Sequence, residues 1–325
     1  MAFRVSSILR QELRLRPAVD LAVRSSCLQL VLARWGLETA ALMGLYGEQT
    51  ANDNDRKVRA VEAITAAMYE SGLDSHATQT EKNMLEKPYR AWEYSDFVYG
   101  DHWESFGVLQ WILGCQHAVP AYYSHFDRAR LFQTTGVMPA DPSTVEKFVG
   151  PFRSQHTWRP SDALQREIDV SEAWVWRARA QVLLDLRTEI GGAKAASQSD
   201  GSSPLDATLR DKHIPHSLLK LAADMPNTIP LAAKRAHARG LVETLEDSDY
   251  AIAVEMKGGG SEARPARVPY ANLDQEHLNA IRKIAEARFF AFAWSVEKVG
   301  DWDIDKIGEL VSINPISSVW TPNGG

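Results

Sequence analysis

The chain has 325 residues, of which 45% are hydrophobic and 24% charged; these proportions are typical of a globular protein, and the length suffices for one large domain or two ordinary ones. The net charge is -6, from 36 basic and 42 acidic residues, which argues against a nucleic-acid-binding protein because these usually carry a basic excess. Only two cysteines are present, neither in a C-x-x-C pair, and no apolar run approaches the roughly 18 residues of a membrane span, so we expect neither a disulfide framework nor a spanning helix.

The N-terminal segment, residues 1–26, is rich in arginine and serine and has Glu12 and Asp20 as its acids. This composition fits two interpretations, a mitochondrial presequence or a basic amphipathic first helix. The first would place the mature protein in the mitochondrial matrix, whereas the second leaves a cytoplasmic location as the expectation. No continuous apolar stretch follows the basic residues, so a secretory signal is not expected.

Apolar residues recur three and four positions apart along most of the chain, as one face of a helix requires. Capping residues and prolines set the predicted ends. For example, Thr78 or Thr80 opens a short helix that closes before Pro88. The predicted helices span residues 21–45, 58–69, 78–86, 101–116, 161–190, 215–223, 231–245 and 274–299.

Three stretches interrupt the helical pattern. Gly191 and Gly192 are expected to end the long helix, and residues 193–203, AKAASQSDGSS, have the composition of a flexible linker or surface insertion. Residues 250–256 alternate apolar and small side chains, which favours a short strand. Residues 311–325 read as an irregular tail.

The sequence therefore predicts an all-α protein, a multi-helix array with at most one small β-hairpin near residues 250–270. Residues 27–310 would form the helical domain. No internal repeat at a fixed period is present.

Several segments, in order, resemble the helical family catalogued as domain of unknown function 4272. The segment Thr78–Glu86 resembles the short helix that precedes the Trp/Glu helix of that family. Glu104 followed by Trp111–Gly114 resembles its Trp-Arg-x-Glu-Ala-Leu stretch and the Trp-Ala-Leu-Gly that closes it. The pair Trp176-Arg177 is similar to an aromatic-Arg pair on a later helix.

A further set of residues near the C-terminus resembles the final helix of the family. It consists of Val268-Pro269-Tyr270, Leu273, Ile281, Ile284-Ala285, Arg288, Phe290-Ala291, Trp294, Trp302-Asp303 and Asp305. The likeness covers roughly residues 22–310. This chain departs from the pattern at Asp101-His102, where the family has Trp-Arg, and at Ala287 and Phe289, where it has Glu and His. The resemblance implies a helical fold and a choice of residues, and it carries no activity.

Three charged residues on apolar helices, Glu104, Arg177 and Arg288, are the main site candidates. Ionisable groups on an apolar face are costly unless they are paired. If the three helices pack together, one carboxylate could bridge two guanidiniums through bidentate hydrogen bonds. This cluster would be either a pocket for a small anionic ligand or a buried ion network that fixes the helices. In an enzyme, Glu104 would act as general acid or base, with His102 as a second proton carrier.

Tryptophans at helical spacing are the other candidates. They would line a ligand pocket or fill a large helical core, and they are Trp103, Trp111, Trp176, Trp294 and Trp302.

Asp303, directly after Trp302, is a further candidate, which would either bind a ligand or cap a following helix. No metal-binding or cofactor motif is present: H-E-x-x-H, the phosphate loop and G-x-G-x-x-G are all missing. We therefore expect no metal and no cofactor. The leading hypothesis is a protein that binds a protein partner or a small anionic ligand, and the alternative is an acid-base enzyme acting on a small anionic substrate.

Overall fold

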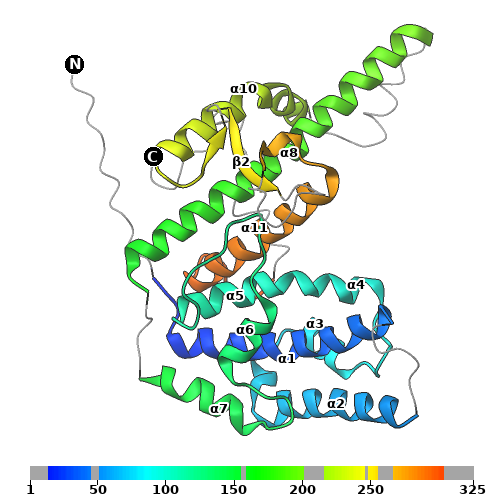
Figure 1. Ribbon diagram of the computed structural model, residues 1–325, viewed down its shortest axis with the longest axis vertical. Coiled ribbons are helices and arrows are strands. Elements are labelled where there is room, and N and C mark those ends of the chain that lie inside the picture. The colour runs from blue at the N-terminus through cyan, green and yellow to red at the C-terminus, as the bar shows by residue number, and fades with distance from the viewer. Residues whose placement is uncertain are drawn as a thin grey trace. The chain divides into compact units, whose positions relative to one another are not determined.

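The computed structural model describes residues 14–44, 51–154, 159–200, 216–245, 248–254 and 266–303. These residues are mostly helical, with one small antiparallel sheet, as the sequence predicts (Figure 1). They divide into two compact units. One contains residues 14–165 and 287–303 and is called here the α1–α7 unit. The other contains residues 166–286 and is called the sheet unit. The divisions fall inside two helices, α8 (Ser161–Asp200) and α11 (Gln275–Ser295).

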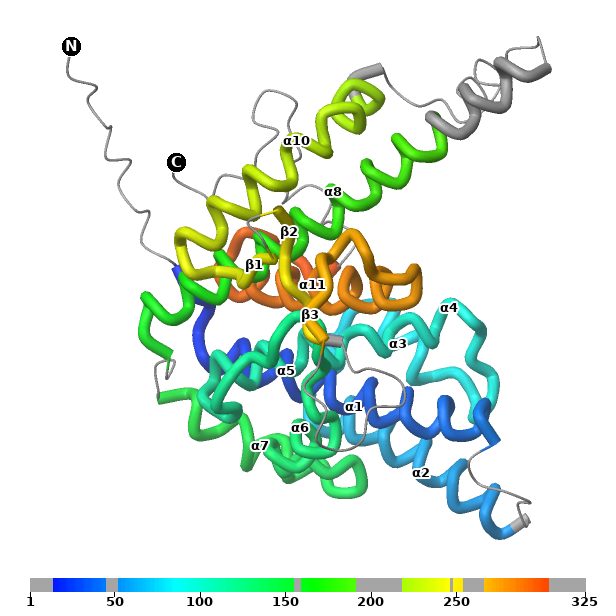
Figure 2. The backbone as a smooth tube through the Cα atoms, turned by 45° about the horizontal axis from the view of Figure 1, so that its top comes forward, coloured from blue at the N-terminus to red at the C-terminus, as the bar shows by residue number. Residues whose placement is uncertain are grey.

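The α1–α7 unit is built around α1 (Ala18–Leu42), which packs against α2 (Ala51–Glu70), α3 (Gln79–Glu86) and α5 (His102–Ile112). The colours of Figure 2 follow this order, with α1 in blue and α5 in cyan-green. Every residue of α5 is buried, so this helix lies inside the unit. The short elements α4 (Tyr94–Phe97), α6 (Arg128–Thr135) and α7 (Ser143–Val149) complete the unit, with single 3-10 turns at Leu73–Ser75, Val98–Asp101 and Gly150–Arg153.

The sheet unit combines most of α8 with α10 (His216–Ala238) and three short strands, β1 (Thr244–Leu245), β2 (Asp249–Val254) and β3 (Ala266–Pro269). The strands pair antiparallel in the order β1-β2-β3, with Ile252 opposite Val268. The β2–β3 pair is the hairpin that the sequence predicts near residues 250–270. The additional strand β1 packs beside it and was not predicted.

Local sequence accounts for several element ends. Thr78 caps α3 through a capping box with Glu81, because the threonine side chain accepts from Glu81 N while the glutamate accepts from Thr78 N. Helix α5 ends at Ile112, four residues before the predicted end at residue 116, and Gly114, whose φ of 80° suits glycine, follows its C-cap. Asp274 accepts from His277 N at 2.9 Å and so opens α11.

The predicted linker is the main departure from the sequence analysis. Helix α8 continues through Gly191 and Gly192 to Asp200, over most of residues 193–203. Two glycines cost about 1 kcal/mol each in a helix, but the alanines and lysine that follow favour its continuation. Residues 201–203 lie outside the described residues. The two helices predicted at 215–223 and 231–245 are one helix, α10, which contains Pro226 and Pro230.

The N-terminal segment is part of the fold from Ala18 onward, because α1 begins there and buries Leu21, Arg24 and Ser25. Residues 1–13 and the predicted tail, 311–325, lie outside the described residues. Among the helices that the structure describes, none combines the length and the apolar composition needed to cross a membrane.

Candidate functional site

The predicted central cluster is two separate ion pairs, one in each unit. In the α1–α7 unit, Arg288 of α11 holds Glu104 of α5, with Nε 2.8 Å and Nη2 2.7 Å from Oε2 of the glutamate. In the sheet unit, Arg177 of α8 is held by Asp249 of β2, with Nε and Nη2 2.6 and 2.7 Å from the two carboxylate oxygens. The prediction that Glu104 bridges both guanidiniums is therefore wrong, because Arg177 has its own carboxylate.

All three guanidinium nitrogens of Arg288 donate hydrogen bonds within the protein. Besides Glu104, it donates to the backbone carbonyls of Pro120 at 2.6 Å and Ser124 at 2.6 Å. Its side chain is 0% exposed. An arginine with no donor left and no access to solvent cannot recognise an incoming anion. Its role is to fasten the loop that follows α5 onto α11.

The other oxygen of Glu104 turns toward the surface. His125 Nδ1 lies 2.9 Å from Oε1, and the imidazole is 55% exposed. Burial acts to raise the pKa of Glu104, but the hydrogen bond with His125 and the charge of Arg288 outweigh it, so the pKa is lowered and the carboxylate stays ionised. The sequence analysis named His102 as the proton carrier and did not pair His125 with Glu104.

Arg177 is equally saturated. Its guanidinium also donates to Gln181 Oε1 at 3.1 Å and lies over the ring of Tyr270 at 4.3 Å. Asp249 accepts in addition from Tyr250 N and Ala271 N, at 2.8 and 2.9 Å. Burial raises the pKa of Tyr270 to about 12, against the pull of Arg177. This pair holds the start of β2 against α8, and Asp249 carried no sequence signal beyond its place at a strand start.

The predicted tryptophans lie in the cores of the two units. Trp103, Trp111, Trp176 and Trp294 are each no more than 8% exposed. Trp111 packs edge-on against Phe292 at 5.9 Å and Trp103 against Phe106 at 6.0 Å. These contacts fit core packing rather than a pocket lining. Asp303 is exposed. The helix that it was predicted to cap would lie at residues 304 and beyond, which are outside the described residues.

An open groove with a volume of about 700 Å³ runs along α2 in the α1–α7 unit. One wall is the α2 face, and the other is the chain from the end of α3 to the turn beyond it. The lining residues are Asn54, Val58, Val61, Glu62, Thr65, Ala66, Tyr69 and 85–90. Val61 and Leu85 are buried in its floor, while Glu62 and Arg90 are exposed at its edge.

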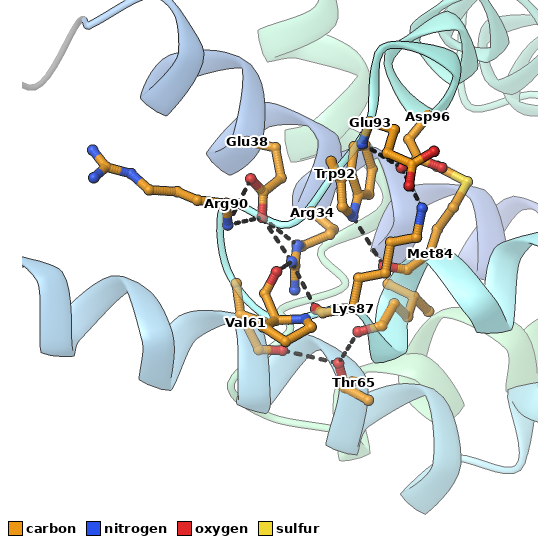
Figure 3. Close-up of polar contacts among 12 residues, drawn as sticks. Arg34, Glu38, Val61, Thr65, Met84, Lys87, Arg90, Trp92, Glu93 and Asp96 are labelled. Atoms are coloured by element: carbon orange, nitrogen blue, oxygen red, sulfur yellow. Dashed lines mark hydrogen bonds and ion pairs between the residues drawn. The ribbon is translucent and has the colours of Figure 1, made fainter.

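A buried ion pair on α1 shapes the turn at the end of this groove (Figure 3). Arg34 donates to Glu38 Oε1 at 2.6 Å and to the carbonyls of Lys87 and Pro88, both at 2.9 Å. Glu38 in turn accepts from the backbone N–H of Arg90, with both oxygens at 3.0 Å. The pair thus grips three backbone groups of the turn.

Arg90 is held in a strained conformation by these bonds. Its φ is 66°, the left-handed region that costs a residue with a side chain on the order of 1 kcal/mol. The Ala91 N–H closes the turn onto the Pro88 carbonyl at 3.0 Å, which leaves Arg90 at the position where glycine or asparagine is preferred. Its side chain points away from Arg34 and Glu38 (Figure 3). Strain of this kind gathers at functional sites, so the groove and this turn form the candidate site.

The sequence carries a signal for this site. Arg34 and Glu38 are charged residues on the apolar helix α1, the same feature that selected Glu104. Spacing of four residues would also have paired Arg34 with Glu38.

Among the described residues, no group of three or more histidine, cysteine, aspartate or glutamate side chains is placed to hold a metal ion. Comparison of the chain with known protein families, with curated proteins and with solved structures finds no match. The resemblance to the domain of unknown function 4272 family therefore stays a prediction.

Proposed function

We propose that this protein acts by binding, and that the groove along α2 receives an amphipathic helix of a partner protein. The observation that carries the proposal is the turn at 87–90, where a buried ion pair and a strained backbone present Arg90 at the edge of an apolar groove. A groove with an apolar floor and charged edges is the usual receptor for an amphipathic helix.

The backbone of the groove wall favours a helix over an extended strand. The Leu85 carbonyl lies 2.9 Å from the Thr65 hydroxyl, the Lys87 and Pro88 carbonyls accept from Arg34, and the Arg90 N–H donates to Glu38. These groups are occupied and cannot pair with an added strand. A helix satisfies its own backbone hydrogen bonds and needs only side-chain contacts.

Charge at the edge defines the partner further. Arg90 would face an acidic residue of the incoming helix, and Glu62 a basic one. From Asn54 to Tyr69 the lined face contains 16 residues, and the 15 steps between them span about 22 Å at 1.5 Å per residue. An occupant of about four turns would match it.

The test is selection of helix-forming peptides of about 20 residues from a displayed library on the purified protein, followed by fluorescence anisotropy. Ala66→Arg places a long charged side chain in the groove. Ala63→Arg makes the same change on the same helix at a residue outside the groove lining. We expect selected peptides to lose at least tenfold in affinity for Ala66→Arg and to keep it for Ala63→Arg. Arg90→Glu should weaken the binding of peptides with an acidic edge. Arg59→Glu, at an exposed residue of α2 outside the groove lining, should leave their binding unchanged.

Three outcomes would overturn the proposal. One is a library that yields no enriched sequence, and another is equal binding to both alanine variants. The third is a dimer of the wild-type protein in sedimentation that Ala66→Arg dissociates, because the groove would then receive a second copy of the chain.

A second proposal, an acid-base enzyme, is favoured by the pairing of a half-exposed imidazole with a buried carboxylate at His125 and Glu104. Glu104 would orient the ring and the other ring nitrogen would carry the proton. Wild type and His125→Gln can be assayed against panels of activated carboxylic and phosphate esters. Turnover that disappears in the variant supports this role, and equal background rates contradict it.

A further inference from the structure

A second cluster in the α1–α7 unit lies apart from the groove and brings three segments together. Arg24 comes from α1, His102 opens α5, and Trp302 follows the end of α11. The Arg24 guanidinium lies 4.7 Å from the centre of the Trp302 ring, and the His102 ring lies 5.9 Å from the same ring. Tyr99 stacks on His102 at 4.3 Å.

Each of the three residues buries a nitrogen that lacks a hydrogen-bond partner among the described residues. These atoms are Arg24 Nε, His102 Nδ1 and Trp302 Nε1. Arg24 and His102 are 3% and 7% exposed. A buried polar group left unpaired costs about 1–3 kcal/mol, and native proteins hold few of them. Three on neighbouring side chains call for an occupant that accepts hydrogen bonds.

The rest of the cluster is fully bonded, so the unpaired nitrogens do not reflect loose packing. Arg24 donates to the His76 carbonyl at 3.1 Å and pairs with Glu81. Glu81 is also bound by the Tyr99 hydroxyl and accepts from Thr78 N at 2.8 Å. The Glu81 carboxylate is shared among several donors and does not bond all of the Arg24 guanidinium. The Nε–H of Arg24 is left to donate to a ligand.

The segment that carries Trp302 is pinned in place. Arg16 donates to the carbonyls of Trp294, Val299 and Gly300, at 2.7, 2.8 and 3.0 Å. Trp302 itself packs edge-on against Phe290 at 4.9 Å and Trp294 at 5.1 Å. Its ring is therefore fixed beside Arg24 and His102.

We propose that Arg24, His102 and Trp302 form a binding site for a small carboxylate. The Nε–H of arginine and the indole N–H only donate, so the ligand must present acceptors. A carboxylate has acceptors alone, about four lone-pair sites on two oxygens, and gains strength from a charged donor. The aromatic rings of Tyr99 and Trp302 suit a compact planar group. This site is independent of the groove.

The experiment is a thermal-shift and calorimetric titration with formate, acetate, propionate and benzoate, and with acetamide and benzamide as neutral matches. Trp302→Phe removes the N–H and keeps an aromatic ring. Trp103→Phe is the matched control, because Trp103 Nε1 is also buried and unpaired but belongs to a side chain that packs against Phe106. We expect at least one carboxylate to raise the melting temperature of wild type and Trp103→Phe by several degrees, with a loss of at least tenfold in affinity in Trp302→Phe.

A second measurement is made on the wild-type protein, and the spectrum of Trp302→Phe serves only to assign one signal. The ten tryptophans give separate indole N–H signals in a ¹⁵N spectrum, and the carboxylate should shift the signal that Trp302→Phe removes. No carboxylate binding, equal binding to both variants, equal binding of the amides, or a shift confined to other indoles would each overturn the site.

Discussion

Three buried arginines of the α1–α7 unit, Arg24, Arg34 and Arg288, each hold a glutamate, and Arg288 and Arg24 differ most in what their donors do. Arg288 spends Nε, Nη1 and Nη2 on Glu104 and on loop carbonyls. Arg24 donates from Nη1 to the His76 carbonyl and from Nη2 to Glu81, and its Nε stays unpaired. The neighbouring side chains of His102 and Trp302 each hold a further unpaired nitrogen. Burial and an ion pair are common to both. Arg34 also leaves one nitrogen, Nη1, unpaired while it holds the turn at 87–90. What distinguishes Arg24 is therefore that unpaired donors of neighbouring side chains gather around it.

The largest expected effect comes from breaking the saturated pair. Arg288→Met leaves the Glu104 carboxylate and several loop carbonyls buried without their donor, so we expect a loss of about 3–5 kcal/mol in the free energy of unfolding. Urea unfolding followed by circular dichroism measures it. The double variant Arg288→Met with Glu104→Gln should recover part of the loss, because no charge then stays buried alone. A single-variant loss below about 1 kcal/mol would mean that the pair is not a brace.

The cluster of Arg24, His102 and Trp302 should make the stability of the protein depend on pH, because burial lowers the pKa of His102 from 6.5 to about 4. The charged groups that face the imidazole act in opposite directions, Glu81 raising its pKa and Arg24 lowering it. The unfolded chain then takes up a proton between pH 6.5 and 4 that the folded chain does not. Stability is therefore complete above pH 6.5 and falls by up to about 3 kcal/mol as the pH drops to 4.

His102→Phe is the variant that checks this effect, because it keeps an aromatic ring at the position and removes the titrating group. The urea midpoint of wild type should fall between pH 7 and 4.5, and the variant should lose most of that dependence. Identical slopes in the two proteins would contradict a neutral buried imidazole. Glu81 and Glu104, whose pKa values are lowered, lose their contribution only at still lower pH.

The comparison also shows what a single sequence can predict. Glu104 and Arg288 stand out as charges on apolar helices, and the structure pairs them. Their meaning was not predictable, because it depends on loop carbonyls at Pro120 and Ser124, which carry no sequence pattern. Arg177 shares the same signal, but its partner Asp249 is 72 residues away at the start of a short strand.

The helices themselves were largely predictable because their period and caps are local. The capping box at Thr78 and Glu81 is one such signal, and in the structure it selects Thr78 from the two starts, Thr78 and Thr80, that the sequence analysis left open. The end of the long helix at residue 190 was mispredicted because our interpretation gave two glycines more weight than the helix formers that follow, and α8 continues to Asp200. The groove escaped prediction since its turn is defined by Arg34 and Glu38, on a helix some fifty residues earlier.

The smallest expected effect is at Arg90, an exposed arginine that is held by its backbone N–H rather than by its side chain. Arg90→Gly removes the steric cost of a φ of 66° and should raise the free energy of unfolding by about 1 kcal/mol, less the entropy that glycine adds to the unfolded chain. Arg90→Ala keeps the strain and should change stability little, so the difference between the two variants in urea isolates the backbone term. Both variants lack the guanidinium, and both should lose the peptides that Arg90 selects through their acidic edge. A residue kept only for the turn would be better as glycine. If Arg90→Gly is more stable than wild type and binds less, the strain is tolerated for the charge that it displays at the groove. If it is less stable, Arg90 serves the turn, and the groove loses the feature that singled it out.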